Sequence, residues 1–236
     1  MIRLPVAGSD DYLEIAPSKI VAVGLNYREH VAESKGLDMD IREIPVEPVL
    51  FAKTPNVLVG PGEPVVIPAF LAEYRFTEPR VDHEAELAVI IGRRCKDVPE
   101  SCALDYVRAY TCFNDVSQRN VQKSDVSGWF RGKSFDTFGP IGPVAVPASG
   151  LPDPQNLDIS CRVNGITKQR SNTSNMIFTV AALIAYISRN MTLEAGDIIV
   201  TGTPSGVSPV VHGDVMEVEI AGIGVLRNPV VDEARS

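Results

Sequence analysis

Ten short segments with the composition of β-strands constrain the fold of this 236-residue chain more than any other feature of its sequence. Turn residues such as Gly60-Pro61-Gly62 separate them, and they do not alternate regularly with helical segments. A doubly wound parallel sheet needs that alternation, so it is not favoured. We expect an α+β fold, with a mostly antiparallel, rolled or sandwiched sheet and a few peripheral helices. The predicted strands are Ile20–Gly24, Val49–Lys53, Pro64–Ile67, Glu84–Gly92, Val107–Asp115, Gly142–Val146, Asp158–Val163, Asp197–Gly202, Asp214–Ile220 and Gly224–Arg227.

Three helices are predicted. The first runs from Asn26, a candidate N-cap, to Lys35, and Gly36 ends it. A short second helix covers Val116–Lys123. The longest covers Asn175–Met191, because apolar side chains recur there at helical spacing. The candidate N-caps of this last helix are Asn172, Ser174 and Asn175.

Composition argues against several classes of function. The formal net charge of −8 and the lack of any Lys/Arg run do not fit a nucleic-acid groove. No apolar stretch is long enough to cross a bilayer, and Met1–Asp11 has neither the basic start nor the apolar run of a secretory leader. The four cysteines form no CxxC pair, so we expect reduced thiols and a cytoplasmic location. An acidic chain needs a local cation to bind an anionic substrate.

Several catalytic signatures are missing from the sequence. No GxGxxG follows a strand and no GxxxxGKS or GxxxxGKT occurs, so nucleotide cofactors have no signature. The serine of Gly202-Thr203-Pro204-Ser205-Gly206 is one position out of place for a nucleophile elbow. His83-Glu84 begins like HExxH, but the second histidine is missing. A nucleotide-dependent enzyme, a serine hydrolase and a zinc protease are therefore not favoured.

Three carboxylates form the sharpest pattern. In the segment that begins Asp82-His83, Glu84 and Glu86 share one face of a strand, with Cβ atoms roughly 6–7 Å apart. Asp115 ends a second apolar strand and is expected beside a cleft. Burying clustered carboxylates is costly unless they are neutralised or bind a cation, and three oxygen donors suit Mg²⁺ or Mn²⁺. The alternative is a polar sheet face that makes surface ion pairs.

Seven motifs follow one another between about Ile20 and Arg227. They are Gly24-Leu25-Asn26-Tyr27-x-x-His30, His83-Glu84-Ala85-Glu86, Asn114-Asp115-x-x-x-Arg119-x-x-Gln122, Lys133-Ser134-Phe135-Asp136, Val163-Asn164-Gly165, Asn172-Thr173-Ser174-Asn175-Met176-Ile177 and Gly196-Asp197-Ile198-Ile199-x-Thr201-Gly202-Thr203-Pro204-x-Gly206-Val207. In this order the motifs resemble those of the fumarylacetoacetate hydrolase family, particularly its short acylpyruvate hydrolase-like members.

The resemblance implies a mixed β-sandwich roll like the C-terminal domain of fumarylacetoacetase, and usually a homodimer. It also implies Mg²⁺ or Mn²⁺ held by Glu84, Glu86 and Asp115. We expect residues 19–230 to form the catalytic domain. Residues 1–18 are then a short N-terminal extension, in place of the additional N-terminal domain of larger members. Ser208 stands where glycine is more usual and is expected to alter its turn slightly.

The resemblance assigns roles to charged residues around the metal site. Lys133 would point into the site, neutralise it and stabilise a developing enolate. His30 and Glu33 would form a dyad on a lid, in which Glu33 orients the imidazole and His30 activates water. Without the resemblance, Lys133 would be a solvated surface lysine and the dyad an exposed helical ion pair.

Further residues would contact the substrate. By resemblance, Arg119 and Gln122 would hold a substrate carboxylate or carbonyl, and Thr203 would hold a carboxylate oxygen with help from nearby backbone N–H groups. The alternatives are a dimer contact for Arg119 and a turn cap for Thr203. The candidates for shaping the pocket of the acyl group are Trp129, Phe130 and the loop around Asp38.

The implied function is a metal-dependent hydrolase that cleaves a carbon–carbon bond of acylpyruvates such as acetylpyruvate or fumarylpyruvate, as in the catabolism of aromatic compounds. Water activated by His30 would attack the distal carbonyl, and pyruvate and a carboxylic acid would result. Two other reactions fit the same site: decarboxylation of oxaloacetate-like acids and isomerisation of a 2-hydroxy-diene-dioate. A non-catalytic keto-acid binder is a further alternative from another class.

Overall fold

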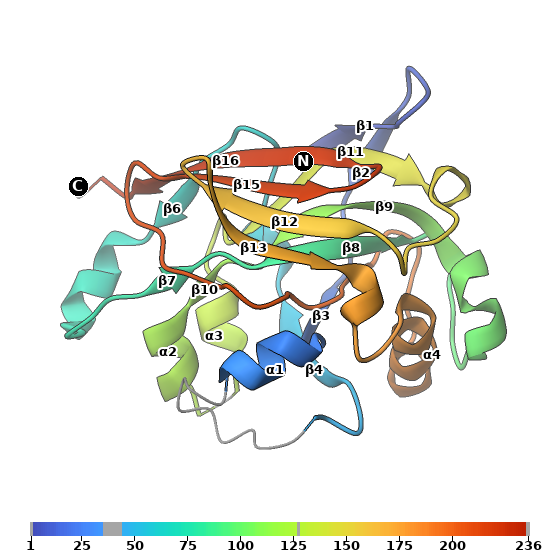
Figure 1. Ribbon diagram of the computed structural model, residues 1–236, viewed down its shortest axis with the longest axis horizontal. Helices are drawn as coiled ribbons and strands as arrows, with labels where there is room; N and C mark the ends of the chain where they lie inside the picture. Colours follow the sequence, from blue (N-terminus) through green and yellow to red (C-terminus); the bar gives the residue numbers. More distant parts are fainter. Residues whose placement is uncertain (1, 35–43, 127, 235–236) are drawn as a thin grey trace.

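Two β-sheets are stacked face to face in the computed structural model, which describes residues 2–34, 44–126 and 128–234, with the backbone alone for 32–34 (Figure 1). Among these residues, a seven-stranded sheet has the order β4-β3-β14-β8-β9-β11-β5 and a five-stranded sheet the order β13-β12-β15-β16-β6. Both sheets are mixed, because β3–β14, β5–β11 and β6–β16 are parallel pairs and the other pairs are antiparallel. Two further two-stranded pairs are β1–β2 and β7–β10. The sheet-rich α+β class predicted above is confirmed.

The strands of the seven-stranded sheet are β3 (Ile20–Gly24), β4 (Val49–Lys53), β5 (Leu58–Val59), β8 (Ala85–Ile91), β9 (Val107–Asn114), β11 (Gly139–Pro147) and β14 (Ile198–Val200). Those of the five-stranded sheet are β6 (Val65–Ile67), β12 (Asp158–Val163), β13 (Ile166–Asn172), β15 (Val215–Ile220) and β16 (Gly224–Asp232). The short pairs are β1 (Ile2–Pro5) with β2 (Tyr12–Ile15), and β7 (Val81–Asp82) with β10 (Ser117–Gln118).

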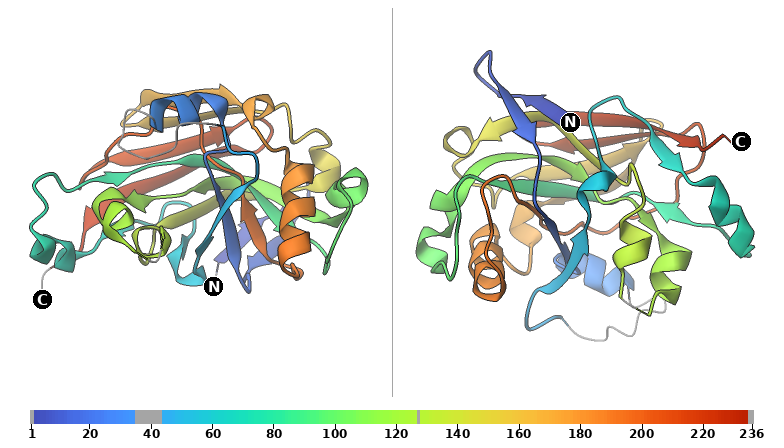
Figure 2. Two further views of the ribbon diagram at one scale, coloured as in Figure 1. Left: turned by 90° about the horizontal axis from the view of Figure 1, so that it is seen from below. Right: turned by 180° about the vertical axis from the view of Figure 1, so that it is seen from behind.

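Helices are short and lie outside the sheets. The α-helices are α1 (Arg28–Ser34), α2 (Arg119–Ser124), α3 (Phe130–Lys133) and α4 (Val180–Asn190), and the 3-10 turns are η1 (Pro55–Val57), η2 (Ala69–Tyr74), η3 (Glu100–Tyr106), η4 (Ala148–Gly150) and η5 (Thr173–Asn175). The α2–α3 pair and α4 lie at opposite ends of the seven-stranded sheet, with α1 between them, in both Figure 1 and the rear view of Figure 2. None of the described helices is long and apolar enough to span a membrane.

Strand β8 is buried on both faces, at every position from Ala85 to Ile91. One face contributes to the core that lies between the sheets, and the other to a second core closed by the β1–β2 hairpin, whose Leu4 and Leu13 are buried there. A strand covered on both sides reads as a continuous apolar run rather than an alternating one. This explains why the sequence becomes apolar on both faces directly after Glu86.

Three helix boundaries differ from prediction. The side chain of Asn26 does not cap α1, because its amide oxygen accepts from Phe178 N–H at 2.8 Å and its amide nitrogen donates to Thr201 O at 2.8 Å. Helix α2 begins only at Arg119, after the short strand β10, and the Gln118 side chain caps it. Helix α4 begins at Val180 with Thr179 as its cap. The polar segment ahead of α4, predicted to be helical, is instead the 3-10 turn η5, whose own cap is Asn172. Gly36, predicted to end the first helix, lies outside the described residues.

The strand β13 was absent from the prediction. It is an edge strand whose residues are mostly exposed, with only Gln169 fully buried, so it lacks the apolar alternation by which strands are recognised. The turn before β13 is the sequence feature that indicates a hairpin here. Asn164 and Gly165 both have positive φ, at 52° and 78°, which is the geometry of a two-residue hairpin turn. All four cysteines are free, as expected.

Candidate metal centre and active site

The antiparallel pairing of β8 with β9 brings the three carboxylates together. Its register places Ala85 opposite Asn114, so Glu84 and Asp115 lie side by side, and Asp115 N–H donates to Glu84 O at 2.8 Å. On the other side of β8, the turn after β14 directs Gly202 N–H onto Glu86 Oε2 at 2.6 Å. Glu84, Glu86 and Asp115 are buried, and each offers one oxygen within 4.8 Å of the others.

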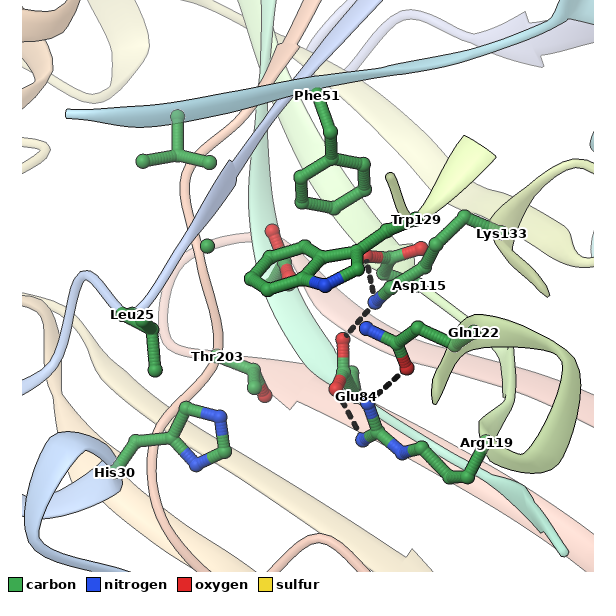
Figure 3. A pocket seen from close by; sticks show the side chains of 13 residues that line it. Leu25, His30, Phe51, Glu84, Asp115, Arg119, Gln122, Trp129, Lys133 and Thr203 are labelled. Carbon is green, nitrogen blue, oxygen red and sulfur yellow. Dashed lines mark hydrogen bonds and ion pairs between the residues drawn. The ribbon is translucent and has the colours of Figure 1, made fainter. Parts of the chain in front are cut away.

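Two buried lysines lie against Asp115. Lys133 Nζ is 2.5 Å from Glu84 Oε2 and 2.6 Å from Asp115 Oδ2, so its ammonium bridges two of the three carboxylates (Figure 3). Lys53 Nζ is 2.6 Å from Asp115 Oδ1. Lys133 is the last residue of α3, and its ammonium also lies 5.0 Å from the centre of the Phe51 ring. Each carboxylate oxygen of Asp115 is thus paired with one ammonium group.

Arg119 links this cluster to a fourth carboxylate. Its guanidinium forms an ion pair with Glu84, and its Nε lies 2.8 Å from Asp82 Oδ2. The other oxygen of Asp82 is 2.8 Å from Arg80 Nε. Asp82 is fully buried, and its two arginine partners compensate its charge. The result is a chain of alternating charges that leads from Arg80, at the surface, to the buried Glu84.

Glu84 and Glu86 have opposite pKa shifts. Burial acts to raise the pKa of Glu84, but the charges of Arg119 and Lys133 outweigh it and hold that pKa below its ordinary value. Burial, followed by the charges of Asp115 and Glu84, raises the pKa of Glu86 well above its ordinary value. Glu86 accepts a hydrogen bond from the backbone N–H of Gly202, whereas Glu84 and Asp115 form ion pairs with cationic side chains. The ionised form of Glu86 is therefore the least compensated of the three.

The donor set fits a divalent cation. Carboxylate oxygens are the ligands that Mg²⁺ and Mn²⁺ prefer, and ligating carboxylates commonly accept further hydrogen bonds from neighbouring groups. The network contains four cationic and four carboxylate side chains, namely Lys53, Arg80, Arg119 and Lys133 with Asp82, Glu84, Glu86 and Asp115. A divalent ion added to this balance would leave two positive charges. The loaded site would therefore attract an anionic substrate.

One pocket of about 320 Å³ collects eight of the nine predicted site residues: His30, Glu84, Glu86, Asp115, Arg119, Gln122, Lys133 and Thr203. The imidazole of His30, on α1, faces the pocket from the side opposite Lys133 (Figure 3). Glu33 lies on the same helix, but its side chain is outside the described residues. The His30–Glu33 dyad therefore stays a prediction.

Gln122 and Thr203 both form hydrogen bonds within the protein, and the Thr203 hydroxyl forms two. Gln122 Oε1 accepts from Arg119 at 3.0 Å. The Thr203 hydroxyl donates to Ala85 O at 2.9 Å and accepts from Gln169 Nε2 at 2.8 Å. These contacts tie the turn after β14 to the start of β8, so Thr203 has a structural role in addition to the predicted contact with a substrate.

Behind the carboxylates, His83 lies in a buried network that includes Ser208. Its Nδ1 is 3.0 Å from Gln169 Oε1 and its Nε2 is 2.9 Å from Ser208 Oγ. Burial lowers the pKa of His83 below its ordinary value, which favours the neutral ring in this network. The hydroxyl of Ser208 thus provides a hydrogen-bond partner for the buried Nε2 atom of His83.

Two residues of the site were missing from the predicted set. Lys53 ends an apolar strand and gave no sign that its ammonium would meet Asp115, because the contact depends on long-range strand order. Trp129 was named only as a residue that could shape the pocket, yet its indole lies within it (Figure 3). Phe130, its neighbour, is 43% exposed and does not line this pocket. Asp38 lies outside the described residues.

Comparisons with known proteins agree with this architecture. The sequence model of the family described as fumarylacetoacetate (FAA) hydrolase C-terminal matches residues 19–231. A mitochondrial oxaloacetate tautomerase of Xenopus laevis is 43% identical over 223 residues, which cover 91% of this chain and 66% of that protein.

Solved structures show the same fold. A 5-carboxymethyl-2-hydroxymuconate delta-isomerase from Mycobacterium smegmatis is 40% identical with a TM-score of 0.81, and the match covers 94% of this chain and 81% of that chain. A maleylpyruvate hydrolase from Sphingobium sp. SYK-6, solved with manganese(II) and pyruvate, is 35% identical with a TM-score of 0.76, covering 92% and 72%. The matched residues, the fold and these likenesses together show that the chain belongs to the fumarylacetoacetate hydrolase family.

Proposed function

We propose that the chain is a Mg²⁺- or Mn²⁺-dependent hydrolase that cleaves the carbon–carbon bond of an acylpyruvate. The observation that carries this proposal is the placement of Glu84, Glu86 and Asp115 in one pocket with Lys133 and His30. The related maleylpyruvate hydrolase, solved with manganese(II) and pyruvate, supports both the metal and the product. The positive charge of the loaded site supports an anionic keto acid as the substrate.

Different residues of the pocket would carry out different steps of the reaction. A divalent ion held by the three carboxylates would polarise the keto group next to the substrate carboxylate. His30 would take a proton from water, and the resulting hydroxide would add to the distal carbonyl. The bond between that carbonyl carbon and the adjacent methylene carbon then breaks, and its electron pair passes to the pyruvate enolate. Lys133 would stabilise this enolate until it takes up a proton and becomes pyruvate.

A second candidate is tautomerisation or isomerisation of a keto acid. The tautomerase of Xenopus laevis and the isomerase of Mycobacterium smegmatis are 43% and 40% identical to this chain, whereas the hydrolase is 35% identical. These reactions also create negative charge on the oxygen of a keto acid, so the same cations would stabilise it. They differ from hydrolysis because His30 would move a proton on carbon instead of activating water.

Product analysis distinguishes the two candidates. Purified protein would be incubated with acetylpyruvate, fumarylpyruvate and the enol form of oxaloacetate, in the presence of Mg²⁺, Mn²⁺ or EDTA, and followed by proton NMR. The hydrolase predicts metal-dependent formation of pyruvate with acetate or fumarate. Faster ketonisation of oxaloacetate without cleavage of either acylpyruvate would replace it with the tautomerase, and carbon dioxide release would indicate a decarboxylase. Family resemblance also leads us to expect a homodimer, which light scattering would test.

A further inference from the structure

Trp129, the single tryptophan of the sequence, occupies a central place in the pocket. Its indole lies across the pocket between Phe51 and the carboxylates (Figure 3). The Phe51 and Trp129 rings meet edge to face, with centroids 5.4 Å apart and an interplanar angle of 69°. Trp129 is only partly buried, so it is not a core residue that happens to be near the site.

The indole of Trp129 packs directly against the backbone of Gly24. A Cβ atom at Gly24 would lie 2.4 Å from Trp129 Cζ3 and 2.9 Å from Trp129 Cη2, well inside the distance at which real atoms pack. Gly24 does not have the left-handed backbone conformation that favours glycine. The requirement for glycine is therefore steric: any other residue would push the indole from its position.

The backbone that follows Trp129 is held in place by several contacts. The Asp125 carboxylate accepts from Arg131 N–H at 3.0 Å, and the Arg131 guanidinium donates to the Tyr74 hydroxyl at 2.6 Å. Gly132 packs so closely on α2 that a Cβ there would lie 2.7 Å from Gln122 N. These contacts fix α3 against α2 directly after Trp129.

The indole lines two neighbouring spaces. The inner pocket of about 320 Å³ contains the carboxylates, and an outer cavity of about 1160 Å³, which is open to solvent, lies beside it. Four side chains line both spaces, namely His30, Arg119, Gln122 and Trp129. For a 2-keto acid held at the carboxylates, a longer chain that reached the outer cavity would have to pass the side chains that line both spaces, of which the indole is one.

We propose that Trp129, packed on Gly24, determines substrate size and restricts this site to 2-keto acids whose chain is no longer than that of acetylpyruvate. The inference rests on the proposed function only in taking a metal-chelating 2-keto acid as the ligand, and it holds for hydrolase and tautomerase alike. Replacement of the indole by a small side chain would join the inner pocket to the outer cavity. Longer keto acids would then fit.

Binding, rather than turnover, provides the test. Calorimetry with Mg²⁺ would measure the affinity for pyruvate, 2-oxopentanoate, 2-oxohexanoate and 2-oxoheptanoate. For the unmodified chain we expect the affinity to fall by at least about tenfold beyond 2-oxopentanoate, which has the chain length of acetylpyruvate, and for Trp129→Ala we expect little dependence on length. Trp129→Phe, which keeps an aromatic ring and is the variant least apt to disturb folding, should give an intermediate dependence. Circular dichroism would confirm that each variant is folded.

Gly24→Ala and Gly150→Ala form a matched pair that leaves the indole present. The methyl group at Gly24 must displace the indole, whereas at Gly150 it meets only Val146 Cγ1, at 3.5 Å. Because the chain has one tryptophan, its emission reports on this ring alone. We expect Gly24→Ala to shift the emission and change the length dependence, and Gly150→Ala to do neither. An equal length dependence in the unmodified chain and folded Trp129→Ala, both of which bind pyruvate, would overturn the inference. Failure of the unmodified chain to bind pyruvate with Mg²⁺ would instead overturn the proposed function.

Discussion

Lys53 Nζ lies 2.6 Å from Asp115 Oδ1, and both side chains are wholly excluded from solvent. Burial lowers the pKa of Lys53, while the Asp115 carboxylate acts in the opposite direction and favours the ammonium form. Removal of one partner from a buried ion pair leaves the other charge uncompensated. This contact therefore connects the stability of the sheet to the charge balance of the candidate metal centre.

Lys53→Met should lower the free energy of unfolding by roughly 3 kcal/mol or more in EDTA, because Asp115 keeps only Lys133 as its cation. Urea unfolding would measure the loss. Saturating Mg²⁺ should reduce it, since the bound ion supplies the missing positive charge. Lys168→Met, at an exposed position of β13, is the matched control and should have almost no effect. Equal stability of both variants would contradict this account of the pair.

Glu86→Gln should affect stability and metal binding in opposite ways. Its carboxylate is the least compensated of the three in the metal-free protein, so the neutral amide should leave the free energy of unfolding in EDTA unchanged or higher by about 1 kcal/mol. Loss of a charged ligand should weaken Mn²⁺ binding by at least about tenfold. Electron paramagnetic resonance of free Mn²⁺ would measure the affinity. Glu14→Gln, at an exposed strand position, should change neither quantity.

Metal binding should release a proton over a defined pH interval. Because the pKa of Glu86 is raised in the folded protein, its carboxyl stays protonated from the ordinary carboxyl range up to that higher pKa. Glu84 contributes no proton in this interval, because its pKa is lowered. In this interval, metal affinity should rise about tenfold per pH unit, and above it the affinity should level off. Calorimetry in buffers of different ionisation enthalpy would count the protons. Release of none at any pH would contradict the raised pKa.

His30→Ala should lower kcat by about 10²- to 10⁴-fold and leave Mn²⁺ affinity unchanged, because His30 is placed to transfer a proton and is not one of the three carboxylates. The same measurement on Glu33→Gln would test the dyad, for which the smaller loss of an orienting residue is expected. A His30→Ala protein that keeps the full rate with metal bound would remove His30 from the mechanism.

The sequence allowed the carboxylate cluster and one of its counter-charges, Lys133, to be predicted, but not the others. Glu84 and Glu86 could be placed together because they share one face of a strand, and the family resemblance joined Asp115 to them. Lys53 could not be placed, because its contact with Asp115 requires the order of strands in the seven-stranded sheet, where β4 and β9 are not neighbours. One ammonium was predicted to neutralise the site, whereas the structure places two lysines and an arginine on its carboxylates.

Local capping was the weakest part of the prediction for the same reason. Asn26 has the side chain of an N-cap, but tertiary hydrogen bonds to Phe178 and Thr201 use both ends of its amide. Likewise, Thr179 was not among the predicted caps of α4, because three polar residues earlier in the chain looked equally suitable. Strand existence followed from composition, whereas helix ends depended on partners far away in the sequence.

The most direct test of the central claim is the consumption of acetylpyruvate by metal-stripped protein as Mg²⁺ is titrated back. The account predicts no catalysed cleavage in EDTA and a rate that rises to a plateau as the metal centre fills, with Glu86→Gln far less active and Glu14→Gln like the unmodified chain. Cleavage at the same rate in EDTA, or full activity of Glu86→Gln, would contradict a metal centre built from Glu84, Glu86 and Asp115.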